Sequence, residues 1–200
     1  MEVFLPMKKT ITSLLLFAAL AFTLGGCAAE KPYVAGAWSG SVYTSAFLGL
    51  NYTLPDGWTA STDGELAEME LQAESALQQA KNSDKASSTK NYHYAVSAKS
   101  GDGTLGVIIM AQRQDYAVKD YVKALQAGAD ADGSNYTLGE IEDRTLGSFE
   151  YTMIPVIVQG QENIQHQYVR VDGSYLVNIM AFAPDDAGFE EIEASFSTPQ

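Results

Sequence analysis

Residues 149–183 read FEYTMIPVIVQGQENIQHQYVRVDGSYLVNIMAFA and carry the clearest secondary-structure signal in the chain. Three runs rich in β-branched and aromatic residues are separated by short connections that contain glycine and polar residues. Such runs and connections are typical of strands joined by tight turns. The segment therefore predicts an antiparallel meander of three strands, at Phe149–Gln159, Asn163–Val171 and Tyr175–Ala183.

Further strands are expected before this meander. Gly101-Asp102-Gly103 is a good hairpin turn between two β-rich runs, and the second run has apolar side chains on both faces. A strand of that kind is covered on both sides. The strands are expected at Trp38–Thr44, Gly49–Leu54, Tyr92–Lys99 and Thr104–Gln112, with one or two weaker edge strands within Tyr136–Leu146.

Three amphipathic helices complete the pattern. Thr62 and Glu65 have the spacing of a capping box and predict the start of the first helix. The second is expected over Val118–Leu125 and ends near Gly128. A short acidic helix follows Pro184, with Phe189, Ile192 and Phe196 on one face. The sequence thus predicts an α+β fold, with an antiparallel sheet of about six or more strands and helices on both faces.

The N-terminal residues have the pattern of an export signal. Met7-Lys8-Lys9 provides a positive flank, so Met7 is the expected start of the protein. The apolar segment Ile11–Leu24 is shorter than the roughly 20 residues that a membrane-spanning helix needs. It ends in Leu24-Gly25-Gly26-Cys27, which contains the only cysteine of the chain.

This arrangement resembles the lipobox of bacterial lipoproteins. The resemblance implies a signal peptide at residues 1–26, cleavage before Cys27, and diacylation of the Cys27 thiol. It divides the mature chain into a lipidated N-terminus and short tether (27–37) and a folded domain (38–200), held on the extracytoplasmic face of the cell membrane. The alternative is that Cys27 is an ordinary free thiol. In either case one cysteine cannot form an internal disulfide.

The charge of the chain bears on its partners. The formal net charge is −13, and it becomes −14 without residues 1–26, which contain two lysines and one glutamate. Nucleic-acid binding depends on clustered basic residues that neutralise phosphates, and no such cluster is visible. The sequence therefore argues against nucleic acid as a partner.

Two segments carry a family resemblance. Gly49–Trp58, followed by a capped helix, resembles the opening of small bacterial lipoproteins related to the PsbP-like α/β sandwich. Tyr175–Ile179 followed by Ile192–Phe196 resembles the end of those domains. The resemblance spans about residues 38–196 and implies non-enzymatic binding to a larger partner. The resemblance transfers no functional residue. The Pro55–Trp58 turn is expected to have a structural role, because proline and glycine set the backbone of the turn and tryptophan can cover the end of the sheet.

Catalytic and metal-binding signatures are weak. His93 and His166 are the only histidines, and neither accompanies a serine in a Gly-x-Ser-x-Gly setting. Two distant histidines are too few for a structural zinc site. Strand alternation predicts His93 on a face with Ala95, Ser97 and Lys99, and His166 on a face with Ile164, Tyr168 and Arg170. Both are expected to be surface or half-buried residues of the sheet, and we predict no catalytic residue, cofactor or metal site.

One loop resembles the start of a calcium-binding loop. Asp130-Ala131-Asp132-Gly133 places the glycine at position four, and Ile141 occupies position twelve, where the calcium loop needs a glutamate. The register therefore favours an ordinary turn. Tyr92 and Tyr94 share a strand face, which fits either an aromatic patch or packing beneath a helix.

The sequence thus predicts a membrane-anchored, extracytoplasmic, non-enzymatic lipoprotein that binds a protein partner or assists envelope assembly. The alternative is a carrier of a small molecule or metal ion with a cleft between sheet and helix. An enzyme is the third hypothesis. A carrier requires a concave pocket with converging polar groups. A protein-binding module requires an exposed apolar or aromatic patch. An enzyme requires an acid, a base and a nucleophile that lie close together.

Overall fold

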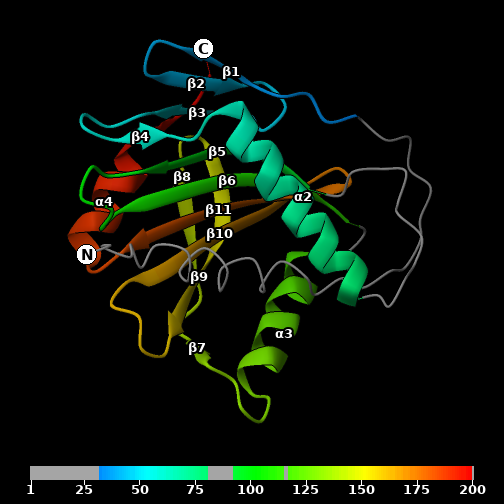
Figure 1. Cartoon of the computed structure of the whole chain (residues 1–200). Helices are drawn as coiled ribbons and strands as arrows, with labels where there is room; N and C mark the ends of the chain where they lie inside the picture. Colours follow the sequence, from blue (N-terminus) through cyan, green and yellow to red (C-terminus); the bar gives the residue numbers. More distant parts are fainter. Residues whose placement is uncertain (1–31, 81–91, 115–116, 200) are drawn as a thin grey trace, which may run out of the picture.

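The computed structural model describes residues 32–80, 92–114 and 117–199. The predicted signal peptide (1–26) and the predicted lipidation site Cys27 lie outside the described residues. Within them the chain forms an α+β fold with antiparallel sheets, as predicted (Figure 1).

The larger sheet has eight strands in the order β4-β5-β6-β11-β10-β9-β7, and β8 also pairs with β9. The predicted meander is confirmed as β9, β10 and β11, and β6 continues the sheet beyond β11. The predicted edge segment at 136–146 forms two strands, which lie along different halves of β9. The strands are β4 (Thr59–Ala60), β5 (Tyr92–Lys99), β6 (Gly106–Arg113), β7 (Tyr136–Leu138), β8 (Glu142–Leu146), β9 (Phe149–Val158), β10 (Ile164–Asp172) and β11 (Tyr175–Ala183).

The N-terminal strands form a second sheet, together with the end of the chain. Its order is β1 (Ala37–Ser39), β2 (Val42–Ser45), β3 (Leu50–Thr53) and β12 (Phe196–Ser197). The single strand predicted at Trp38–Thr44 is wrong, because Gly40 turns the chain with a φ of +61° and makes a hairpin of β1 and β2. Placing Phe196 on the last helix is also wrong, since Phe196 lies in β12 and pairs with Tyr52.

Both faces of the larger sheet are covered. On one face, α2 (Asp63–Ala80) packs Leu66 on Met110, and α3 (Val118–Ala129) packs Leu125 in a cluster with Leu176. On the other face lie α4 (Asp186–Ala194) and the small sheet (Figure 1). Helices on both faces are therefore confirmed, and the small sheet is an additional cover that the sequence did not predict.

The predicted start of α2 is confirmed by reciprocal hydrogen bonds. The Thr62 amide donates to Glu65 Oε2 at 2.7 Å, and the Glu65 amide donates to Thr62 Oγ1 at 3.3 Å. These bonds satisfy backbone donors that a helix leaves free in its first turn. They also lower the pKa of the Glu65 carboxyl, so the box is complete when this side chain is charged.

A bulge in β5 changes which side chains share a face. Tyr94 pairs with Met110 and Val96 pairs with Ile109, so Ala95 is the extra residue. Because the bulge inserts one residue, it shifts the alternation of side chains along the rest of the strand. His93, opposite Ala111, therefore does not share a face with Ser97, and that part of the prediction is wrong.

Candidate functional site

The end of the predicted tether is packed against the domain. The Tyr33 ring stacks on His93, with centroids 4.1 Å apart and planes 3° apart, and meets Phe47 edge-on at 4.9 Å. Burial raises the pKa of the Tyr33 phenol. Three residues later, the Gly36 amide donates to the Tyr43 hydroxyl at 2.9 Å. We call these two contacts the tether clasp.

Gly36 is suited to its place in the tether clasp because it has no side chain. A Cβ at this position would lie 2.5 Å from Tyr43 Cζ and 2.5 Å from the Thr44 carbonyl oxygen, which real structures do not tolerate. The backbone can therefore approach β2 closely only with glycine here. The clasp joins the N-terminal segment to both sheets, since His93 lies in β5 and Tyr43 in β2.

The first strand of the small sheet has no neighbouring strand on one side among the residues that the structure describes. All three residues of β1 are exposed, and β1 lies at one end of that sheet. Next to it, Val34 is 61% exposed and Trp38 is 37% exposed. The Trp38 ring meets Tyr43 at 5.4 Å, so one side of the indole packs on the small sheet. We call β1 with these two side chains the β1 edge.

The corresponding edge of the larger sheet is covered by carboxylates. β4 pairs with β5 only at Lys99 and Ala98, which leaves the first half of β5 without a neighbouring strand among those described. Here Glu74 Oε1 accepts from the Tyr92 amide at 3.1 Å, and Glu70 Oε1 accepts from the Tyr94 amide at 3.3 Å. Glu70 and Glu74 are four residues apart and therefore about 6 Å apart along the helix, which is close to the distance between two strand residues i and i+2. Side chains of α2 thus occupy the amides that another strand would use.

The opposite edge of the larger sheet is charged. The first three residues of β8 are Glu142, Asp143 and Arg144, and all of them are exposed. Arg144 Nη2 lies 2.7 Å from Glu142 Oε1. Charged side chains on an edge strand discourage pairing with another chain. Of these edges, the β1 edge is therefore the one that is uncharged and carries exposed apolar side chains.

The structure does not bring the two histidines together. His93 pairs with Ala111 on β6, whereas His166 pairs with Ala181 on β11 and with Pro155 on β9. Both are half-buried, as predicted. With β6 and β11 between their strands, the two side chains cannot bind one metal ion.

His166 packs against α4. Its ring stacks on Phe189 with centroids 3.5 Å apart and planes 3° apart, and its Nδ1 lies 3.4 Å from the Tyr168 hydroxyl. Desolvation by burial lowers the pKa of His166 to about 4. The imidazole is therefore neutral at pH 7 and a weaker base than an ordinary histidine.

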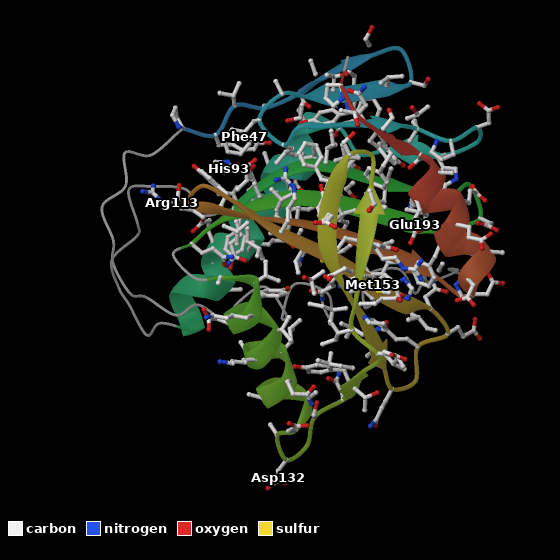
Figure 2. The ribbon with its side chains drawn as sticks, turned by 180° about the vertical axis from the view of Figure 1, so that it is seen from behind. Phe47, His93, Arg113, Asp132, Met153 and Glu193 are labelled. Carbon is white, nitrogen blue, oxygen red and sulfur yellow. The ribbon has the colours of Figure 1, made fainter. Side chains whose placement is uncertain are left out.

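Carboxylates of α4 take hydrogen bonds from the body of the domain. The Tyr168 hydroxyl donates to Glu193 Oε1 at 2.6 Å, and Trp58 Nε1 donates to Glu191 Oε1 at 3.2 Å. Burial and the nearby Glu193 carboxylate raise the pKa of Tyr168. This group of side chains attaches α4 to the sheets, because Glu193 is paired with Tyr168 and Glu191 with Trp58. Figure 2 shows Glu193 on α4.

A buried polar network lies beneath α3. The Tyr121 hydroxyl donates to Gln167 Oε1 at 2.6 Å, and Asn178 Nδ2 donates to the Tyr121 hydroxyl at 3.2 Å. Closer to α2, Gln112 Nε2 donates to the Tyr92 hydroxyl at 3.3 Å. Here the polar side chains under the helices bind one another and connect α3 to the sheet. Tyr92 and Tyr94 are both buried beneath α2, so the packing interpretation of this pair is confirmed.

The loop that resembled a calcium site has the geometry of a turn. Asp130 Oδ1 accepts from Gln126 Nε2 at 2.9 Å, and Gly133 adopts a φ of +79°. Within the described ranges, no three His, Cys, Asp or Glu side chains lie close enough to hold a metal ion. No helix of these same ranges is long and apolar enough to cross a membrane.

Several side chains of these sites carried no signal in the sequence. Tyr33 and Phe47 are single aromatics in segments without periodicity, so only the folded chain places them against His93. Glu70 and Glu74 have helical i, i+4 spacing, which alone suggests a solvated helix face. Their partners are backbone amides of β5, and amides have no sequence signature.

Comparison with known proteins gives similarity at the level of structure. No family model and no curated protein matches the chain. The chain is similar to the solution structure of cyanobacterial PsbP (CyanoP) from Synechocystis sp. PCC 6803, with 14% identity and a TM-score of 0.45, over 88% of this chain and 99% of that one. It is also similar to a protein from Bacteroides thetaiotaomicron, with 12% identity and a TM-score of 0.39, over 80% of this chain and 49% of that one. The chain spans about half the length of the second protein.

Proposed function

We propose that the protein is an extracytoplasmic lipoprotein that is held on the cell membrane through Cys27 and binds a protein partner without catalysing a reaction. The observation that carries the proposal is the Leu24–Cys27 motif, at the end of an apolar segment too short to remain as a membrane-spanning helix. Two acyl chains on one cysteine supply the pair of hydrophobic signals that stable anchoring needs.

The state of the titratable side chains supports binding over catalysis. A general base is most effective when its pKa lies near the working pH. Burial instead lowers the pKa of His166 to about 4, and its imidazole is stacked on Phe189. The Glu193 carboxylate already accepts a hydrogen bond from Tyr168. These groups act as parts of the packing of α4.

The β1 edge is the surface that we assign to the partner. An extended segment of another protein can add a strand to an open sheet edge, with main-chain hydrogen bonds giving affinity and side-chain contacts giving specificity. The β1 edge offers exposed backbone and the exposed side chains of Val34 and Trp38. The carboxylates of Glu70 and Glu74 disfavour the same mode of binding at β5.

Replacement of Cys27 by serine is expected to abolish anchoring, because a serine hydroxyl cannot form the thioether that carries the diacylglycerol. Fatty-acid labelling should be lost completely, and any processed, unacylated protein should leave the detergent phase. Labelling with a radioactive fatty acid and partitioning in a phase-separating detergent measure this. Ala28→Ser, one residue away, is the matched control and should behave like the parent. Unchanged labelling and partitioning of the Cys27→Ser protein would contradict the lipoprotein assignment.

The partner assignment is tested with photoreactive side chains in the lipidated, full-length protein. A photoreactive residue at Val34 should cross-link to one defined protein in membranes, whereas the same residue at Leu71, which is 70% exposed on α2, should not. Ser39→Lys should reduce the yield of the product cross-linked at Val34 several-fold without changing the melting temperature, because a lysine on the edge of a sheet opposes the addition of another strand. Equal products at Val34 and Leu71, or a Val34 product that Ser39→Lys leaves unchanged, would contradict binding at the β1 edge.

A further inference from the structure

The tether clasp begins very close to the anchor in sequence. Tyr33 is six residues after Cys27, whereas the start of the predicted domain at Trp38 is eleven residues after it. A fully extended chain advances at most about 3.5 Å per residue. Six residues therefore reach about 20 Å from the membrane surface, and eleven would reach about 38 Å.

These reaches can be compared with the size of the domain. A domain of this length has a radius of gyration of about 15 Å, which corresponds to a diameter of about 40 Å. Figure 2 shows Phe47 and His93 of the clasp region towards one end of the domain, with strands of the small sheet beyond them, and Asp132 at the opposite tip. If the Asp132 end touched the membrane, the clasp would have to sit most of this diameter above it. A chain that is free up to Trp38 nearly allows that arrangement, whereas a chain held at Tyr33 does not.

We infer that the tether clasp orients the domain, so that the end carrying Phe47 and His93 faces the phospholipid membrane and the Asp132 end points away. This inference rests on the proposed anchoring through Cys27. The partner of the surface around the clasp is then the lipid bilayer that holds the acyl chains.

The orientation also restricts where a partner can bind. Val34 belongs to the β1 edge and directly follows the stacked Tyr33, so the β1 edge lies within the same short distance of the membrane. A segment that adds to β1 must therefore come from a protein that is itself at the membrane surface. The loop around Asp132 would be left for contacts farther from the bilayer.

Energy transfer to lipids tests the orientation. Since Cys27 is the only cysteine and acylation blocks its thiol, a cysteine introduced at Val34 or Asp132 can be labelled selectively. Both side chains are exposed. The lipidated, labelled protein is placed on phosphatidylcholine vesicles that contain acceptor-labelled headgroups, because neutral lipids remove orientation by charge. Transfer should be several-fold stronger from the label at Val34 than from the label at Asp132.

Three tether variants serve as controls for the clasp. A flexible glycine-serine insertion of about twelve residues after Ala29 should raise transfer from Asp132 towards that from Val34, because it lets the domain turn over. Tyr33→Ala should raise it less, since Gly36 still holds the chain, and Tyr33→Phe, which keeps the stacked ring, should leave it unchanged. Equal transfer from the two labels in the parent, or no response to the insertion, would overturn the inference. A protein that lacks acyl chains and does not sediment with the vesicles would instead overturn the proposed function, and the inference with it.

Discussion

Replacing Trp58 by alanine is expected to lower the free energy of unfolding by about 3–5 kcal/mol, a large share of what a single domain has. Trp58 is 8% exposed and belongs to the main core cluster between the two sheets. Its amide donates to the Pro55 carbonyl at 3.1 Å, which holds the predicted turn, and its indole donates to Glu191 on α4. The alanine variant loses the ring and leaves a cavity where β4, α4 and the sheets meet. Urea unfolding monitored by circular dichroism measures the change.

Trp58→Phe separates the packing of the ring from its hydrogen bond. Phenylalanine keeps most of the apolar area but donates nothing to Glu191, so we expect a loss of about 1–2 kcal/mol. Both variants should lose partner binding only as far as they unfold, and Trp58→Ala should be cut readily by proteases. If Trp58→Ala unfolded at the urea concentration of the parent and yet failed to bind a partner, Trp58 would be a recognition residue and its assignment to stability would be wrong.

Replacing Arg170 by alanine is expected to lower the free energy of unfolding by about 3 kcal/mol. This side chain is only 13% exposed and lies between the two sheets. Its guanidinium donates to the Leu48 carbonyl in the turn between β2 and β3, and to the Tyr151 hydroxyl at 3.3 Å. It also stands 4.5 Å above the centre of the Phe149 ring. Removing it leaves the Leu48 carbonyl without this donor and separates the small sheet from β10.

Two variants identify which of these contacts matters. Arg170→Lys keeps the charge but cannot reach three acceptors with a planar group, so we expect a loss of about 1–2 kcal/mol. Asp172→Asn removes only the ion pair with Arg170, which has a length of 3.3 Å. The Asp172 side chain is 44% exposed, so this change should lower the free energy of unfolding by less than about 1 kcal/mol. Thermal and urea unfolding of the three proteins give the order. A larger loss for Asp172→Asn than for Arg170→Ala would show that the ion pair, and not the contact with Leu48, joins the sheets.

Much of the secondary structure could be predicted because its causes lie within a few residues. The meander of β9, β10 and β11 follows from runs of strand-forming residues between short turns, and β5 was predicted with its observed ends. The reciprocal bonds of Thr62 and Glu65 join residues three positions apart. The Leu24–Cys27 motif is local in the same sense, and it remains the basis of the proposed anchoring.

The candidate sites could be predicted only in part. The sequence located both histidines on strands, and it placed His166 on the face of Tyr168, which the structure confirms. It did not predict that His166 stacks on Phe189, which is the packing that removes water from the imidazole and lowers its pKa. Nor did it predict the bulge at Ala95, because a bulge depends on how two strands pair.

By itself, the sequence determined the fold class, the turns of the meander, the helix starts and the acidic, single-cysteine character of the chain, since each depends on local spacing or on composition. Only the tertiary structure decided which strands form separate sheets, where Phe196 pairs, and what lies against Tyr33. Arg170 and Leu48 are 122 residues apart in sequence, and Trp58 and Glu191 are 133 apart. Contacts of this range depend on closing long loops and on the shape of both packed surfaces, and neither is encoded in the spacing of neighbouring residues.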